Sequence, residues 1–260
     1  MAEKMRERAI IEEQQLGRSR RMTRRRLAVA AAASFAAAFT LAACQNVATY
    51  SEPSLVRFID ASYVAPAANA VVEGQLVAAN VGQGTITSYA TVSVNSAALI
   101  QIEDTSTSKA LVTTNGTLLA GKEHSVFLTD NGTASSGYVV TILEDQNTAA
   151  ASNHSAFRFL NQAPKTGAVD IYMVPSNSTL ANSVPLVTNL AVGGTAGYVS
   201  FVSQTVTLVV TPTGTTTPKY TSSSLALTGG EVRTVLIMDT QLTSDPPVMV
   251  SIAADAGPAD

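Results

Sequence analysis

The amino-acid sequence predicts an all-β protein with two tandem immunoglobulin-like antiparallel β-sandwich domains after an N-terminal signal helix. Three observations predict this fold. Thr, Ser, Val, Ala and Gly are abundant after residue 43 and Trp is absent, which favours strands and turns over long helices. Short apolar runs alternate with turn residues, and the series of runs occurs twice. The roughly 215 residues after residue 43 can form two cores of about 100 residues each.

The chain begins with a segment typical of an export signal. Residues 24–44 read RRRLAVAAAASFAAAFTLAAC, a basic cluster, then an apolar run, then small residues before Cys44. This layout also resembles the lipobox of bacterial lipoproteins. The resemblance implies that residues 1–43 are removed and that Cys44 is lipidated, so that the rest of the chain is attached to a membrane.

An uncleaved transmembrane helix is the alternative interpretation of this segment. The apolar run from Leu27 to Ala43 is shorter than the roughly 20 residues that a bilayer span needs. Cys44 is the only cysteine in the chain, so it cannot form an internal disulfide. Gln45 follows the cysteine, and by resemblance to sorting in Gram-negative lipoproteins this implies the outer membrane, on its periplasmic or surface face.

Two features upstream of the apolar run leave alternatives open. Residues 23–27, TRRRL, resemble the twin-arginine export motif, while an ordinary basic signal region also explains them. Residues 1–21 are charged and long for a signal, which either a translation start at Met22 or a dispensable cytoplasmic lead would explain.

The charge of the chain separates into two unlike parts. Residues 1–43 hold nine of the 16 Lys and Arg and four of the 19 Asp and Glu. Residues 44–260 therefore carry seven basic and 15 acidic residues, a net charge of −8. The seven basic residues are scattered along the sequence, and an acidic surface without a basic patch excludes nucleic-acid binding.

A duplication organises the chain after the signal. SLVRFI at 54–59 returns as SAFRFL at 155–160, a shift of 101 positions. From about Tyr89 to Asp130 we expect an ungapped shift of 109, which aligns Tyr89 with Tyr198. The second copy accommodates its extra residues in the stretch Pro175–Pro185, an insertion that a surface loop tolerates.

Each element follows from apolar runs and turn residues. In the first copy we expect strands at 55–60, 69–73, 85–92, 97–103, 109–113, 117–119, 123–129 and 138–143. We expect turns at Gly82–Gly84, Asn115–Gly116, Ala120–Gly121 and Asn131–Gly132. The last strand of the second copy is expected at 248–252, with a frayed end from Asp255 onward. The predicted parts are signal peptide 1–43, tether 44–53, domain 54–145, linker 146–153, domain 154–255 and tail 256–260.

Both copies resemble one family signature. The residues that carry it in the first copy are RFIDAS at 57–62, Ala65–Pro66 and NAVVEG at 69–74. In the second copy they are Arg158, Pro164 and AVDIY at 168–172. These segments resemble the opening of domain of unknown function 4397, which runs roughly V-R-V-V-H-A-S-P-D-A-P-A-V-D-V-Y-V-x-G.

The resemblance covers nearly all of the chain after the tether. It implies an exported bacterial protein with immunoglobulin-like sheets and implies no established biochemical role. Both copies depart from the signature at its histidine, which is Asp60 in the first copy and Asn161 in the second. Any role of that imidazole is therefore absent.

The stretch GTLLAGK at 116–122 has the spacing of a phosphate-binding loop. The next residue is Glu123 where a Ser or Thr should meet Mg²⁺, and a carboxylate there repels phosphate. The strand–turn–strand context is also wrong for such a loop. We therefore predict no nucleotide site and no cofactor.

The sequence predicts neither a metal site nor a hydrolase site. His124 and His154 are the only histidines, and no spacing typical of zinc ligands accompanies them. No G-x-S-x-G motif is present. The doublets Glu103–Asp104 and Glu144–Asp145 are expected at solvated strand ends rather than in a catalytic acid pair or metal site, and the Asn-Gly pairs are expected to be turns.

Arg57 and Arg158 occupy equivalent positions on the first strand of each copy. One interpretation is a structural ion pair within each domain, because the planar guanidinium binds a carboxylate through two hydrogen bonds. An exposed charge on an edge strand explains them equally well. The candidate partners are Asp130 and Asp239, or Asp145 and Asp255.

These observations predict a lipid-anchored cell-envelope protein with a non-enzymatic binding or structural role. Its expected partners are the membrane, through lipid on Cys44, and a protein or glycan ligand at the sandwich loops, above all Pro175–Pro185. The alternative is an envelope enzyme, or an accessory subunit of an envelope enzyme or export complex. Clustering of Asp60, Glu103 and His124 would favour that alternative.

Overall fold

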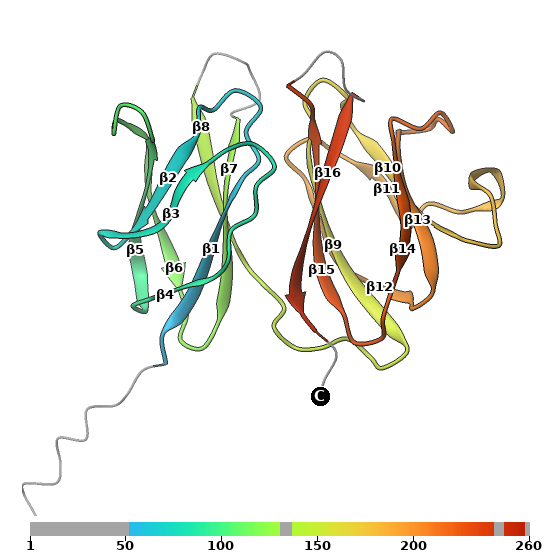
Figure 1. Cartoon of the computed structure of the whole chain (residues 1–260), viewed down its shortest axis with the longest axis horizontal. Helices are drawn as coiled ribbons and strands as arrows, with labels where there is room; N and C mark the ends of the chain where they lie inside the picture. The colour runs from blue at the N-terminus through green and yellow to red at the C-terminus, as the bar shows by residue number, and fades with distance from the viewer. Residues whose placement is uncertain (1–51, 131–136, 242–246, 258–260) are drawn as a thin grey trace, which may run out of the picture. The chain divides into compact units, whose positions relative to one another are not determined.

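The computed structural model describes residues 52–130, 137–241 and 247–257 (Figure 1). Residues Ser51–Asp260 form one compact unit, separate from Met1–Tyr50. The predicted signal, Cys44, the Asn131–Gly132 turn and the last three residues lie outside the described residues. None of the helical structure described has the length and apolar character of a membrane span.

The all-β prediction is confirmed, since sixteen strands and one short 3-10 helix make up the regular structure of the described residues. We call residues 54–145 the N-terminal half and residues 154–256 the C-terminal half. The strands of the N-terminal half are β1 (Ser54–Asp60), β2 (Ala68–Val72), β3 (Gln75–Val81), β4 (Ala90–Val92), β5 (Asn95–Asp104), β6 (Ala110–Leu118), β7 (Glu123–Asp130) and β8 (Tyr138–Glu144). Those of the C-terminal half are β9 (His154–Gln162), β10 (Val169–Pro175), β11 (Val187–Leu190), β12 (Thr195–Val202), β13 (Thr205–Pro212), β14 (Tyr220–Ala226), β15 (Val232–Asp239) and β16 (Val248–Ala256), with the 3-10 helix η1 (Leu180–Asn182) between β10 and β11.

Each half contains two four-stranded sheets, and the two halves have corresponding strand orders. The inner sheets are β4-β1-β7-β8 and β12-β9-β15-β16, and the outer sheets are β3-β2-β5-β6 and β11-β10-β13-β14. The antiparallel prediction holds for most pairs, but β1 pairs with β7 and β9 pairs with β15 in parallel. These parallel pairs arise because the chain passes through the outer sheet between the two strands, a crossover that short-range turn signals do not reveal.

Side-chain alternation divides the inner strands between two buried faces. In β1, Val56 and Phe58 enter the core of the N-terminal half, while Ile59 faces the opposite side. In β9, Phe157 and Phe159 enter the core of the C-terminal half in the same way. Because successive side chains of a strand point to opposite faces, a strand buried on both faces needs a nearly continuous apolar sequence.

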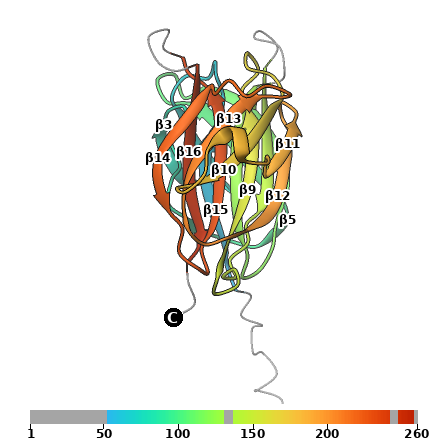
Figure 2. The same cartoon turned by 90° about the vertical axis from the view of Figure 1, so that its right-hand side faces the viewer.

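The two inner sheets share a third apolar core, which lies between the halves. Its buried members come from β1, β7, β9 and β15 and the segment after β1, and are Ile59, Ala61, Phe127, Leu160, Leu236 and Met238. Ile86, Leu143 and Met249 pack against them. The view in Figure 2 is along this stack of sheets from the side of the C-terminal half.

Several predicted elements differ from the observed ones. Strand β3 was not predicted, and the two runs at 109–113 and 117–119 form one strand, β6. The prediction of a turn at Asn115–Gly116 is therefore wrong. Gly116 lies within β6. A Cβ at this position would lie 2.0 Å from the Cδ1 of Ile142, so the glycine allows the opposite sheet to pack closely against this strand.

The end of the chain and the register of the duplication also differ from the predictions. Strand β16 continues to Ala256, so the frayed end predicted from Asp255 is wrong for that residue, which is buried. Val72 of β2 pairs with Ile100 of β5, and its counterpart Met173 of β10 pairs with Leu208 of β13, so the shift between β5 and β13 is 108 rather than 109 here. A one-residue difference matters because it moves a side chain to the other face of the sheet.

Candidate functional site: a buried network between the two halves

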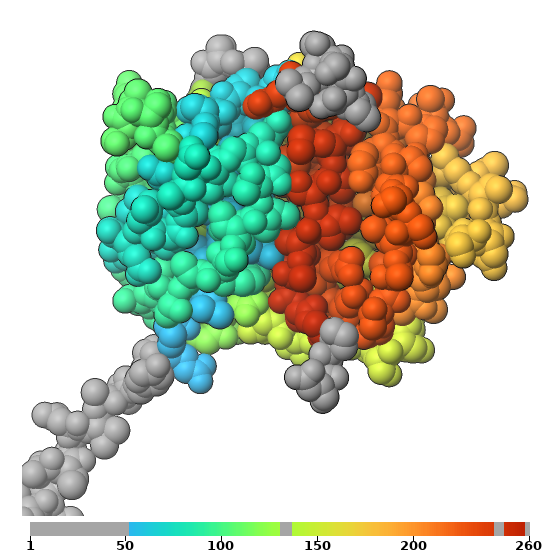
Figure 3. Space-filling view, in the orientation of Figure 1, coloured from blue at the N-terminus to red at the C-terminus, as the bar shows by residue number. Residues whose placement is uncertain are grey.

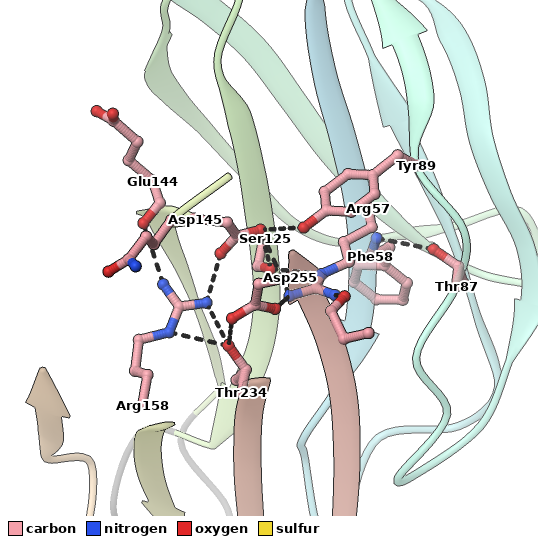
Figure 4. Close-up of polar contacts among 12 residues, drawn as sticks. Arg57, Phe58, Thr87, Tyr89, Ser125, Glu144, Asp145, Arg158, Thr234 and Asp255 are labelled. Atoms are coloured by element: carbon pink, nitrogen blue, oxygen red, sulfur yellow. Dashed lines mark hydrogen bonds and ion pairs between the residues drawn. The ribbon is translucent and has the colours of Figure 1, made fainter. Parts of the chain in front are cut away.

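The densest buried polar cluster among the described residues lies between the inner sheets, beside the third apolar core. It contains two equivalent sets of four residues. The set from the N-terminal half is Arg57, Tyr89, Ser125 and Asp145, and the set from the C-terminal half is Arg158, Tyr198, Thr234 and Asp255. Figure 4 shows these residues except Tyr198. We call these eight residues the inter-half network.

Arg57 extends from β1 toward the last strand of the other half. Its Nε donates to the Oγ of Ser125 at 2.7 Å, and its Nη1 donates to the carbonyl of Ala254 at 3.0 Å. Its Nη2 pairs with the carboxylate of Asp255 and also lies 3.5 Å from the carboxylate of Asp145. The guanidinium therefore joins the two halves.

Arg158 makes the reciprocal contacts from β9. Its Nε donates to the Oγ1 of Thr234 at 3.1 Å, and its Nη1 donates to the carbonyl of Glu144 at 3.1 Å. Its Nη2 pairs with the carboxylate of Asp145. Each arginine therefore binds an acidic residue at the end of the other half. The predicted pairing within a domain is wrong for Arg158 and Asp255, whereas Arg57 also lies within ion-pair distance of Asp145 in its own half.

A tyrosine and a hydroxyl complete each set. The hydroxyl of Tyr89 donates to Asp145 at 2.7 Å, and that of Tyr198 donates to Asp255 at 2.7 Å. The guanidinium carbon of Arg57 lies 4.8 Å from the centre of the Tyr89 ring, the distance of a cation–π contact. The guanidinium of Arg158 lies over the Tyr198 ring in the same way, at 5.0 Å.

The electrostatics of the network favour the charged form of Arg57 and the protonated form of both tyrosines. Burial alone would lower the pKa of Arg57, but the nearby carboxylates of Asp145 and Asp255 raise it above its usual value. Burial raises the pKa of the Tyr89 hydroxyl, as does the neighbouring charge of Asp145. Burial likewise raises the pKa of Tyr198, so both phenols stay protonated and act as donors.

The network is structural because its members satisfy one another. Asp145 and Asp255 have side chains without exposed area and accept hydrogen bonds from arginine, tyrosine and hydroxyl donors. Removal of one partner of such a pair leaves the other charge buried and uncompensated, at a cost of about 3–5 kcal/mol. This arrangement can hold two sheets together, and its arginines and carboxylates are all buried.

The residues that would favour an enzyme lie apart. The parallel register places His124 beside Val56 and Asp60 beside Leu128, four residues or about 13 Å along the strands. Glu103 belongs to the outer sheet, opposite Asn69. Asp60, Glu103 and His124 therefore do not form one site.

Other predicted positions have local roles. Asp104 accepts hydrogen bonds from the backbone and hydroxyl of Ser106 in the turn after β5, and these lower its pKa. Lys122, the last residue of the rejected phosphate loop, pairs with Glu144 at 2.8 Å on the surface. Among the described residues no group of three or more His, Cys, Asp and Glu has the arrangement of a metal site.

The sequence interpretation missed one Ser–His contact. The Oγ of Ser54 lies 3.0 Å from the Nδ1 of His124, and burial lowers the pKa of this histidine. A serine nucleophile needs access to its substrate, but Ser54 is fully buried. The contact therefore fastens the start of β1 to the start of β7.

The sequence also left the tyrosine and hydroxyl members of the network unassigned. Tyr89 and Tyr198 were aligned with each other, yet nothing local to them indicates a carboxylate partner. The run VLIM at 235–238 has no polar residues alternating with the apolar ones, and this pattern indicates that β15 is buried on both faces.

Comparisons with known proteins add a family match for part of the chain. Residues 54–172 match the family of a domain of unknown function, DUF4397. This match covers the N-terminal half and the beginning of the C-terminal half. A search of curated proteins found no match.

A search of solved structures found the crystal structure of CBMbc (family CBM26) from Eubacterium rectale Amy13K in complex with maltoheptaose. The identity is 9% and the TM-score is 0.23, and the match covers 75% of this chain and 95% of that chain. A TM-score this low carries no argument about the ligand of this protein.

Proposed function

We propose that this protein is a lipid-anchored cell-envelope protein with a non-enzymatic binding or structural role. The observation that carries the proposal is the inter-half network, in which the buried arginines and carboxylates bind one another instead of facing an open site. Such a network joins two β-sandwiches into one firm support. Loops on a firm support commonly carry recognition.

The loop after β10 is the proposed contact surface for a protein or glycan ligand. Val184 has 85% of its surface exposed, which is large for an apolar side chain. Leu180 in η1 packs against Tyr172, Val174 and Val209 on the outer sheet, so the loop is held at one end and exposed at the other. The proposal for this loop therefore concerns residues 181–185.

The membrane attachment in this proposal depends on the sequence around Cys44. A lipid on this residue would leave a short tether before Ser54, where β1 begins. The outer membrane is the proposed location, on its periplasmic or surface face.

Acyl labelling of cells that produce the wild type or the Cys44→Ala variant tests the attachment. We expect label on the wild type and none on the variant. Labelled Cys44→Ala protein, or an unlabelled wild type, would contradict the lipid anchor. Protease treatment of intact cells then distinguishes surface display, in which the protein is digested, from periplasmic display, in which it is protected.

The alternative of an enzyme would depend on the Ser54–His124 contact. A fluorophosphonate probe modifies serine nucleophiles that a histidine activates. We expect no labelling of the wild type. Labelling that Ser54→Ala abolishes would overturn the non-enzymatic proposal.

A further inference from the structure

Asp60 and Asn161 are equivalent residues with different hydrogen bonds. Each lies near the end of the first strand of its half, and each accepts a hydrogen bond from the backbone N–H two residues later, Ser62 or Ala163. The backbone carbonyl of each accepts a hydrogen bond from a glycine, Gly84 at 2.7 Å or Gly193 at 2.8 Å. The two sites therefore have the same backbone geometry.

The second polar atom of each side chain differs between the halves. The Nδ2 of Asn161 donates to the carbonyls of Gly167 and Leu190, both at 2.9 Å. The Oδ2 of Asp60 is buried and has no hydrogen-bond partner in the structure. In the alignment of the halves Pro66 corresponds to Gly167 and Val81 to Leu190, so we expect the carbonyls of Pro66 and Val81, which can only accept hydrogen bonds, to face this oxygen.

A carboxylate in this position would leave three oxygens facing one another without a hydrogen between them. A carboxylic acid relieves this conflict in part, because its single O–H donates to one carbonyl where the asparagine amide donates to two. Asp60 has no exposed surface, so solvent cannot satisfy the ionised form.

The surroundings of Asp60 also favour its protonated form. Burial and, to a smaller extent, the charge of Asp130 raise the pKa of Asp60 to about 7, against the opposing hydrogen bond from the Ser62 N–H. Asp130, at the end of β7, is itself held by the hydroxyl of Ser62 and the N–H of Tyr63. Tyr138, at the start of β8, is the other ionisable group coupled to Asp60, and burial raises its pKa.

We propose that Asp60 is a built-in pH sensor, a protonated donor that holds one end of the inter-half contact and releases it on ionisation. Two successive hydrogen bonds connect Asp60 with the other half. The carbonyl of Asp60 binds the N–H of Gly84, and the carbonyl of Gly84 accepts from the Oγ of Ser251 at 2.7 Å. In Figure 3 the red surface of β16 lies directly against the N-terminal half along this contact.

The dependence on pH has a definite sign. The unfolded chain ionises Asp60 near the ordinary aspartate pKa of 3.8, whereas the folded chain keeps the proton to about pH 7. Between these values the folded state binds more protons, so its stability falls as pH rises, and the loss is complete above about pH 7. The folding equilibrium constant should fall by about tenfold per pH unit in this window, about 10³-fold in total.

Urea unfolding of the wild type and Asp60→Asn from pH 4 to 9 tests this inference. The amide donates at every pH, so we expect the variant and the wild type to have similar stability near pH 4. Above pH 7 the folding equilibrium constant of the variant should exceed that of the wild type by up to about 10³-fold. The reciprocal variant Asn161→Asp should acquire the same dependence in the C-terminal half. Equal pH profiles for the wild type and Asp60→Asn would overturn the proposal.

Two measurements on the wild type keep the test valid if a variant fails to fold. Carbon-13 NMR of the Asp60 carboxyl should give a titration midpoint near 7, and a midpoint near 4 would overturn the proposal. Hydrogen exchange of the Gly84 amide, corrected for its intrinsic dependence on pH, should accelerate above pH 7, with Gly193 as the control. Equal acceleration at both glycines would contradict the release of this contact by Asp60.

Discussion

The faces that the two halves present to each other are nearly equivalent, whereas their loops and outer faces differ. At the inner face every contact of Arg57 with Ser125, Asp255 and the Ala254 carbonyl has a counterpart made by Arg158. Outside the inter-half network, one half has Asp60 and the other Asn161, and among the described residues only the C-terminal half has a 3-10 helix.

This difference shows which kinds of contact restrict the residue type at a position. A buried charge must meet its partner within hydrogen-bond distance, so each arginine depends on an acid in the other half and neither half can change alone. A loop residue meets solvent in place of a fixed partner, and it can differ between the halves at little cost.

The largest expected effect is the loss of an acid from the inter-half network. Asp145→Ala removes the partner of Arg158 and a neighbour of Arg57, so we expect a loss of about 3–5 kcal/mol in the free energy of unfolding, measured by urea denaturation. Asp255→Ala should cost a similar amount if the two sets are equivalent.

The adjacent residue Glu144 is a matched control for Asp145. Its side chain is 44% exposed and pairs with Lys122 on the surface, so Glu144→Ala should cost at most about 1 kcal/mol. Equal losses for Asp145→Ala and Glu144→Ala would show that the network does not hold the halves together.

A smaller effect is expected at the two equivalent glycines. Gly84 and Gly193 both have positive φ, at 77° and 75°, so an alanine at either position costs about 1–2 kcal/mol. At Gly84 the new Cβ would also lie 2.6 Å from the Cε of Met249, whereas at Gly193 it would meet nothing within 4 Å.

The Cε of Met249 is the end of a flexible side chain that can shift, so Gly84→Ala should be the more destabilising of the two by no more than about 1 kcal/mol. Thermal unfolding of both variants gives the comparison. If the two substitutions lower stability equally, the close contact between β16 and the segment after β3 does not contribute to holding the halves together.

The smallest effect concerns the loop that only the C-terminal half has. Leu180 is partly buried against the outer sheet, so Leu180→Ala should cost about 1–2 kcal/mol, less than a fully buried leucine. Val184→Ser, at an exposed position, should change stability by no more than about 0.5 kcal/mol. A larger loss for Val184→Ser would show that this residue packs against the protein and is not free for a ligand.

Much of the fold was predictable from local patterns. Alternating apolar residues and turn glycines indicated most strands of the N-terminal half, and the repeated spacing indicated that Arg57 and Arg158 are equivalent. The same patterns failed at Asn115–Gly116, where a glycine that commonly marks a turn instead makes room for Ile142.

The sequence by itself determined that the protein is all-β and that Arg57 and Arg158 occupy equivalent positions. Only the tertiary structure decided that β1 and β7 run parallel and that Arg57 binds Asp255 across the halves. The physical reason is that periodicity along a strand tells which side chains are buried, but not which distant surface buries them. The partner of Arg57 lies 198 positions away, and only the packing of two complete sheets brings the two residues together.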